Sequence, residues 1–241
     1  MKTIIILIIC SCLLLPNKSN SQNTAAIAGA TAGLLAVGAG MVASIEEMKE
    51  KTELTATEYI LTNHPELQFF SLKTLDFDGK KLKDMSSVSV ISYKIQEFVP
   101  SDDPKLTGKK QILFGFTSYG WVSEQGINFN KVQWFLIDRD EWVNMMVAYA
   151  KVSSNEKNDS KLKQSVSNGL IVNRGIKVKG KMVVPFYNLE EDMYLTTDYS
   201  DAMKLVYNER SLGIFLKKTM NLVQISRSDL IKTHEYFFEN D

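Results

Sequence analysis

The sequence predicts an α+β fold, with a mostly antiparallel sheet and three or four helices, preceded by a hydrophobic helix rich in alanine and glycine. From residue 67 onward, apolar and polar residues often alternate with the period of two that strands produce. Strand-like segments also neighbour one another more often than they alternate with helical segments, which favours antiparallel pairing. The expected organisation is a signal peptide at 1–21, a hydrophobic helix at 22–44, an amphipathic helix at 45–66 and an α+β domain at 67–241.

The N-terminal segment is predicted to be a secretion signal. Lys2 precedes a long apolar run, and Ser19 and Ser21 provide the small residues expected before cleavage ahead of Gln22. Lipid attachment at Cys12 is the alternative interpretation. The apolar run continues beyond that cysteine, which argues against it. Cleavage would remove both cysteines of the chain, so the mature protein is expected to lack disulfides, thiol nucleophiles and thiolate metal sites.

The charge of the chain argues against a nucleic-acid partner. The sequence contains 28 lysines and arginines and 28 acidic residues, and the signal peptide removes Lys2 and Lys18. A chain so close to neutral gives no basic footprint for nucleic acid. Arginine, the usual residue for bidentate recognition of phosphate, is scarce, so sites for anionic ligands are not expected. The composition and the predicted signal together indicate an exported protein of the periplasm or outer membrane of a bacterium.

The uncharged stretch 25–44 is predicted to be a helix whose side chains separate by size. Large apolar side chains recur every seven residues, and small residues form the opposite face. Gly29 and Gly33 have the spacing of the Gly-xxx-Gly packing that brings helices together in lipid. At about 1.5 Å per residue the stretch is long enough to cross a bilayer core. The residues expected to contact another helix or the membrane are Ile27, Gly29, Gly33, Leu34, Ala36, Gly40 and Met41.

This stretch needs a partner, because each glycine costs an isolated helix about 1 kcal/mol relative to alanine. Membrane insertion or self-association is the leading interpretation. Burial against the chain's own domain and a flexible leader are the alternatives. An amphipathic helix is expected to follow, since Ser44 and Glu47 have the spacing of a capping box and Pro65 ends the pattern.

The first part of the domain combines strands with one aromatic helix. The prolines and paired aspartates of 100–110 predict a loop, and Asp78-Gly79 predicts a turn. The polar segment 153–165 is expected to be a mobile linker, and two small lobes joined at 153–166 are the alternative to a single domain. The predicted strands are 67–77, 88–99, 111–123 and 131–137, and the predicted helix is 141–152.

The second part of the domain is also dominated by predicted strands. A hairpin is expected to turn at Gly180. Residues 131–151 and 221–240 share a pattern of a strand, a polar step centred on arginine and an aromatic helix, for which internal duplication is one explanation. The predicted elements are strands at 170–178, 181–188, 193–197, 212–217 and 220–226, a helix at 200–208 and a final helix capped by Ser228 and Asp229.

No catalytic constellation is recognisable in the sequence. His64 is expected at a helix end and His234 on the surface, which leaves little for a zinc site. Ser118 lies in a strand rather than at a nucleophile elbow, and the calcium-like start at 76–79 lacks the required glutamate. The acidic clusters 138–141 and 190–192 are attributed to helix capping and a solvated turn. The sequence therefore predicts no catalytic, cofactor-binding or metal-binding residue and no cofactor.

Aromatic residues gathered in 114–142 form the one positive feature of the domain. The main interpretation is a hydrophobic core. The alternative is an exposed face for proteins or glycans, if Gly115 or Gly120 marks a bulge. The candidates for that face are Phe114, Phe116, Trp121 and Trp134.

The function expected from these features is that of a non-enzymatic cell-envelope protein, an accessory or assembly subunit of a membrane-associated complex. Its expected partners are other envelope proteins or further copies of itself, with the membrane contacted through residues 25–44. The alternatives are a secreted carboxylate-dependent hydrolase and a ring- or pore-forming protein assembled through its small-residue helix.

Overall fold

A computed structural model describes residues 45–76, 90–119, 121–123, 126–186, 195–207 and 211–239, all within the unit 36–241. The predicted signal peptide, the stretch 25–44 with its seven contact residues, the turn at Asp78-Gly79 and the acidic cluster 190–192 lie outside these ranges. The fold class is α+β with antiparallel sheets, as the sequence predicts.

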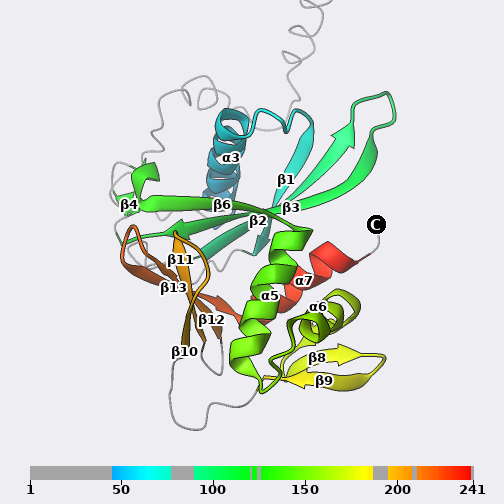
Figure 1. Cartoon of the computed structure of the whole chain (residues 1–241). Helices are drawn as coiled ribbons and strands as arrows, with labels where there is room; N and C mark the ends of the chain where they lie inside the picture. The colour runs from blue at the N-terminus through cyan, green and yellow to red at the C-terminus, as the bar shows by residue number, and fades with distance from the viewer. Residues whose placement is uncertain are drawn as a thin grey trace, which may run out of the picture. The chain divides into compact units, whose positions relative to one another are not determined.

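The first half of the domain is a four-stranded antiparallel sheet in the order β1-β2-β3-β6 (Figure 1). Helix α3 precedes this sheet, and helix α5 follows its last strand without a linker. The short strands β4 (Val122–Ser123) and β5 (Gly126–Ile127) and a 3-10 turn at Phe129–Lys131 connect β3 to β6. The main elements are α3 (Ile45–Asn63), β1 (Phe70–Asp76), β2 (Val90–Val99), β3 (Lys105–Thr117), β6 (Val132–Asp138) and α5 (Arg139–Ser153).

The second half repeats this arrangement, with a four-stranded antiparallel sheet in the order β10-β11-β12-β13 and helix α7 directly after it. Between the halves lies a segment, residues 154–186, that we call the insert; it holds α6 (Asp159–Asn168) and a three-stranded sheet of β7 (Leu170–Val172), β8 (Gly175–Val178) and β9 (Lys181–Pro185). The elements of the second half are β10 (Leu195–Asp198), β11 (Met203–Tyr207), β12 (Ser211–Leu216), β13 (Asn221–Ser226) and α7 (Arg227–Phe238).

The two halves match in register as well as in topology. Gln111 pairs with Asp138 at the end of the first sheet, and Ser211 pairs with Ser226 at the same place in the second. Asp138 and Ser226 each cap the helix that follows, accepting a hydrogen bond from the backbone N–H three residues on. This agreement is what an internal duplication would produce.

Each helix also contacts the sheet of the other half. Helix α5 packs against β10 and β11, whereas α7 contacts β1 and β3. The hydroxyl of Tyr236 on α7 donates to the carbonyl of Ile95 on β2 at 2.6 Å, and the hydroxyl of Tyr199 donates to Glu141 on α5 at 2.7 Å. The halves therefore share one hydrophobic cluster, to which both sheets, both helices and the insert contribute.

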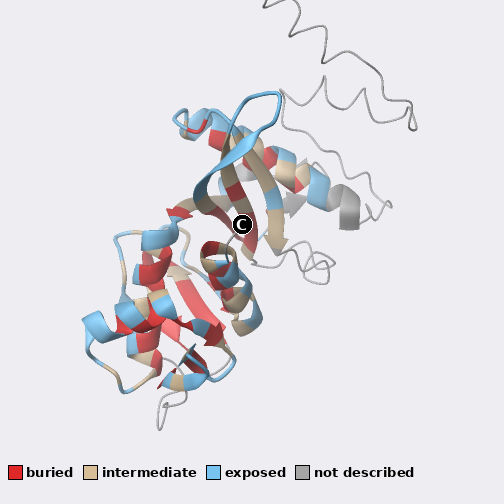
Figure 2. Cartoon of the chain, turned by 90° about the vertical axis from the view of Figure 1, so that its right-hand side faces the viewer, coloured by how far each residue is buried: buried red, intermediate tan, exposed pale blue. Residues whose placement is uncertain are grey.

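A second hydrophobic cluster lies between α3 and the other face of the first sheet. The inward face of that sheet joins the shared cluster, whereas Ile91, Tyr93 and Ile95 point towards α3. Side chains alternate between the two faces of a strand, so one set of residues packs in the shared cluster and the other set packs under α3. Figure 2 shows buried residues along the strands and in the helices, and exposed residues at the β2–β3 turn.

Three predicted elements differ from the structure. Residues 200–208 were expected to be helical, but 203–207 form β11, whose Met203, Leu205 and Tyr207 face the shared cluster with the period of a strand. Part of the predicted loop 100–110 belongs to β3, which extends beyond the core as a solvent-exposed ladder with β2. Such a ladder needs no apolar alternation, so its sequence resembles a loop.

The predicted linker 153–165 mostly precedes or forms helix α6. Asn158 caps this helix by accepting a hydrogen bond from the N–H of Lys161, and Leu162 and Val166 are fully buried in the shared cluster. A helix that buries only one narrow stripe appears polar in sequence. The buried residues on both sides of this segment belong to the same cluster, while the two-lobe boundary at 153–166 stays a prediction.

Candidate functional site

His234 is buried and not on the surface, contrary to the sequence prediction. It is 1% exposed, and its two ring nitrogens have different partners. The indole N–H of Trp142 donates to Nδ1 at 3.2 Å, and Nε2 lies 3.0 Å from the carbonyl oxygen of Gly169. Because the indole is only a donor, Nδ1 accepts and Nε2 carries the proton. Burial lowers the pKa of His234, so the histidine is held neutral and serves the core.

The other groups singled out as candidates also have structural partners. His64 lies directly after α3, and its Nδ1 is 3.1 Å from the carboxylate of Glu66. Ser118 is buried, and its hydroxyl accepts a hydrogen bond from the side-chain amide of Asn221 at 2.9 Å. Asp138 accepts the N–H of Glu141 at 2.9 Å as the cap of α5, which confirms the capping interpretation. None of these arrangements exposes an activated nucleophile.

The aromatic residues proposed as a binding face lie mainly in the interior. Phe114, Phe116 and Trp121 are at most 2% exposed, so the core interpretation is correct for them and the exposed-face alternative is wrong. Trp134 is half-buried under α3, stacked on Tyr59 with ring centroids 5.3 Å apart. Gly115 forms no bulge: it pairs in register with Trp134, whose ring lies across the position where a Cβ would stand.

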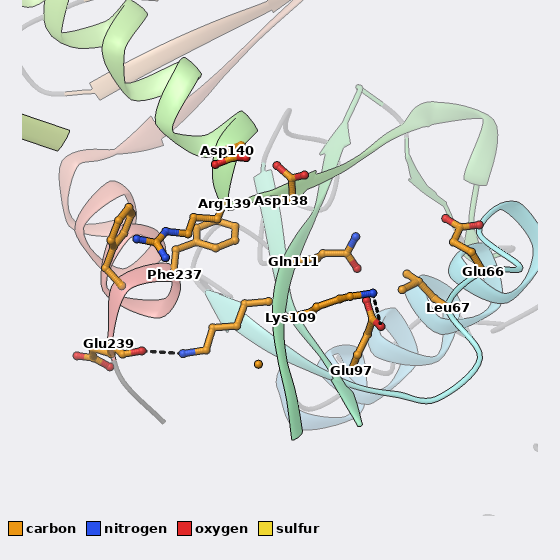
Figure 3. Close-up of a pocket in the computed structure, with 13 residues that line it drawn as sticks. Glu66, Leu67, Glu97, Lys109, Gln111, Asp138, Arg139, Asp140, Phe237 and Glu239 are labelled. Atoms are coloured by element: carbon orange, nitrogen blue, oxygen red, sulfur yellow. Dashed lines mark hydrogen bonds and ion pairs between the residues drawn. The ribbon is translucent and has the colours of Figure 1, made fainter. Parts of the chain in front are cut away.

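The structure does contain an open groove where β3 meets the start of α5 and the end of α7 (Figure 3). Its cavity volume is about 730 Å³. Strand β3 contributes Gly108, Lys109, Lys110 and Gln111, and the β6–α5 junction contributes Asp138, Arg139 and Asp140. The end of α7 contributes Phe237 and Phe238, and Glu239 follows them. The other lining residues are Glu66, Leu67 and Glu97.

The cations of the groove are held by nearby groups. Lys109 lies 3.3 Å from the carboxylate of Glu97, and Lys110 donates to the carbonyl of Glu239 at 2.7 Å. The guanidinium of Arg139 stacks over the ring of Phe238 at 4.3 Å from its centre. These contacts orient the three cations without fully burying them, since Lys109 and Arg139 are exposed and Lys110 is half-buried. Lys109 and Lys110 are neighbours on β3 and point to opposite sides of the strand, towards Glu97 and Glu239 respectively.

Three of the carboxylates that line the groove have ordinary structural roles. Glu97 is paired with Lys109, Asp138 caps α5 and Glu66 accompanies His64. Hydrogen bonds from its own backbone and from His64 lower the pKa of Glu66. That direction is opposite to the one a general acid requires, so this carboxylate does not favour the hydrolase alternative.

A second surface feature is a group of apolar side chains around the extended end of the β2–β3 hairpin. We call Phe69, Phe98, Val99 and Leu106 the hairpin patch; Phe98 is half-buried, and Val99 follows it on β2 and points to the opposite face of the ladder. Phe69, Val99 and Leu106 are 47%, 56% and 50% exposed, and the rings of Phe69 and Phe98 lie 6.3 Å apart. Phe98 and Leu106 are cross-strand partners, so they share a face of the ladder.

Two further findings concern the described residues alone. Among them, no group of three or more histidine, cysteine or acidic side chains is placed to hold a metal ion. Within the same residues, no helix combines the length and apolar character required to span a membrane.

Comparison with protein-family models, with curated proteins and with solved structures finds no match for this chain. The site is therefore interpreted from its own geometry. Sequence reasoning missed the groove because its residues come from five separate parts of the chain. The one available signal was the repeated step Asp138-Arg139-Asp140 and Ser226-Arg227-Ser228, which marks equivalent places in the two halves.

Proposed function

We propose that this chain is a non-enzymatic, exported protein of the bacterial cell envelope that acts through protein–protein contacts, as an accessory or assembly subunit of a membrane-associated complex. The predicted signal peptide and the small-residue stretch 25–44 support export and membrane association. The hairpin patch is the observation in the structure that supports a role in protein contacts.

The hairpin patch supports binding because its apolar side chains are exposed where the ladder extends beyond the core. Leucine and valine side chains that are about half exposed lose favourable burial unless a partner covers them. Charged residues surround the patch, among them Lys105, Asp102 and Asp103. An apolar centre with a polar rim is the usual arrangement of a protein interface.

The membrane part of the proposal is tested by fractionation of the mature chain against a variant that lacks residues 22–44. We expect the full chain to pellet with membranes and to resist high salt, and the deletion variant to remain in the supernatant. A full chain that is soluble, together with a deletion variant that is unstable, would instead show that the stretch belongs to the core.

The contact part is tested by in-cell crosslinking from a photoreactive residue placed at Leu106. The matched control is the same residue at Leu170, which is also exposed but lies on β7, away from the patch. We expect discrete adducts from position 106 and none from position 170. Equal yields from both positions would contradict a specific role for the hairpin patch.

A further inference from the structure

Arg139 and Arg227 occupy equivalent positions in the two halves. Each is the first helical residue after the residue that caps α5 or α7. The strand pairs Gln111–Asp138 and Ser211–Ser226 place the two arginines at the same register of their sheets. The residues that pack beside Arg227 therefore indicate what kind of group could bind beside Arg139.

In the second half, the insert lies beside Arg227. Helix α7 contacts β7 of the insert, α5 contacts α6, and Tyr149 packs edge-on against Phe186 with ring centroids 5.1 Å apart. Side chains of the second half donate to backbone carbonyls of the insert. The donor and acceptor pairs are Arg227 with Asn173, His234 with Gly169 at 3.0 Å, and Tyr207 with Phe186 at 2.7 Å.

This mode of attachment depends on backbone carbonyls. Three carbonyls along the insert, those of Gly169, Asn173 and Phe186, accept from side-chain donors of the second half. A polypeptide of different sequence but similar extended path would offer the same acceptors. The insert thus shows how a chain segment binds beside the arginine of this repeat.

In the first half, the groove lies beside the equivalent arginine, Arg139. Arg139 is exposed and stacked on Phe238, and Lys110 donates to the carbonyl of Glu239 on the same side of the groove, whereas Lys109 lies across β3 against Glu97. Among the described residues, no segment covers Arg139 in the way that the insert covers Arg227. We propose that the groove is a docking site for an extended segment of a partner polypeptide, which takes the place that the insert holds in the second half.

The charges of the groove fit a polypeptide better than a simple anion. Asp138, Asp140 and Glu97 line it together with the three cations, so an anion such as phosphate would meet repulsion as well as attraction. A peptide backbone presents both carbonyl acceptors and N–H donors along its length, and the lining offers partners for both. The cavity volume of about 730 Å³ lies within the range of pockets that enclose ligands of several hundred daltons.

The proposal rests on the proposed function, because it names the site and the partner chemistry of the same contact role. The test uses the full chain and a fluorescently labelled synthetic peptide with the sequence of residues 169–186, the insert's own hairpin segment. We expect saturable binding by fluorescence anisotropy, and at least tenfold weaker binding to Arg139→Gln. The matched control is Arg174→Gln, since Arg174 is exposed and lies outside the groove; its affinity should equal that of the wild type.

Two results would overturn the proposal. One is the absence of saturable peptide binding, and the other is equal affinity of wild type and Arg139→Gln. Displacement of bound peptide by millimolar inorganic phosphate in the wild type, with the Arg139→Gln variant unable to bind phosphate, would assign the groove to an anion instead and also count against it.

In-cell crosslinking separates this inference from the proposed function. A photoreactive residue at position 109 reports on the groove, and one at position 106 reports on the hairpin patch. Adducts from position 106 without any from position 109 would remove the groove proposal and leave the proposed function standing. No adduct from either position would remove both.

Discussion

At the scale of single residues, His234 differs most from its prediction. Its segment, Lys-Thr-His-Glu, resembles an exposed helix face, yet the ring is buried between α5 and the insert. Trp142 and Gly169 satisfy both ring nitrogens, and Phe238 stacks on the ring with centroids 4.4 Å apart. A buried polar side chain is tolerated when both of its hydrogen bonds are made.

This arrangement predicts a pH-dependent stability. Burial lowers the pKa of His234 in the folded chain, so below the ordinary histidine pKa of about 6.5 the unfolded chain takes up a proton that the folded chain does not. The free energy of unfolding should therefore fall with decreasing pH below about 6.5, by up to about 1.4 kcal/mol per pH unit. Urea unfolding measured between pH 5 and 8 checks this.

The matched control is the other histidine. His64→Gln leaves the buried ring of His234 and its two hydrogen bonds in place and should therefore keep the pH dependence. His234→Leu should lose it and should also cost about 2 kcal/mol at pH 7.5, since leucine offers the indole N–H of Trp142 no acceptor. An unchanged profile in His234→Leu would contradict the assignment.

At the scale of elements, α3 is attached to the first sheet by a carboxylate as well as by its apolar face. One oxygen of Glu53 accepts from the backbone N–H of Thr74 at 2.8 Å and from its hydroxyl at 2.6 Å. Because β1 is an edge strand, that N–H has no partner strand, and Glu53 supplies the acceptor. The threonine hydroxyls of α3, such as those of Thr52 and Thr55, bond to carbonyls of the helix itself.

We expect Glu53→Ala to reduce the free energy of unfolding by about 1–3 kcal/mol, because a half-buried N–H and a hydroxyl lose a charged acceptor. The measurement is urea unfolding at neutral pH. Glu58→Ala is the control on the same helix, since only the backbone carbonyl of Glu58 is used, by Thr62. Equal losses in the two variants would mean that helix propensity, not the contact with Thr74, decides the effect.

At the scale of the whole molecule, the exchange of helices links the two halves. Trp142 of α5 stacks on Phe237 of α7 with ring centroids 6.2 Å apart, and both belong to the shared cluster. The first sheet contributes Ile112 and Phe114 to that cluster, and the second contributes Leu212 and Ile214. Neither half keeps the shared cluster when the other unfolds, and we therefore expect the free energy of unfolding to belong to the domain as one unit.

A single cooperative transition is therefore expected. Trp134 reports on the cluster under α3, whereas Trp142 reports on the shared cluster. In each of two variants that retain Trp134 or Trp142 as the sole tryptophan, with Trp121 also replaced, the fluorescence midpoint in urea should coincide with the far-UV circular dichroism midpoint of the same variant. Separate midpoints for the Trp134 cluster and the secondary structure would favour independent lobes.

Sequence patterns alone determined the elements whose evidence is local. The period of two predicts β2, β6 and β13, the capping residue Asp138 predicts the start of α5, and Gly180 predicts the β8–β9 turn, where its φ is +78°. Positive φ is inexpensive only for glycine, so this signal is carried by one residue. The repeated polar step centred on arginine likewise indicated the equivalence of the two halves.

Only the tertiary structure decided the features that join distant parts of the chain. β11 is a strand because β10 and β12 flank it, and α6 is a helix because the shared cluster buries Leu162 and Val166. The burial of His234 depends on Trp142 and Gly169, which lie 92 and 65 residues away. The groove likewise exists only where β3, α5 and α7 meet. Such contacts depend on each helix packing against the sheet of the other half, and the spacing of residues within a short segment cannot predict that packing.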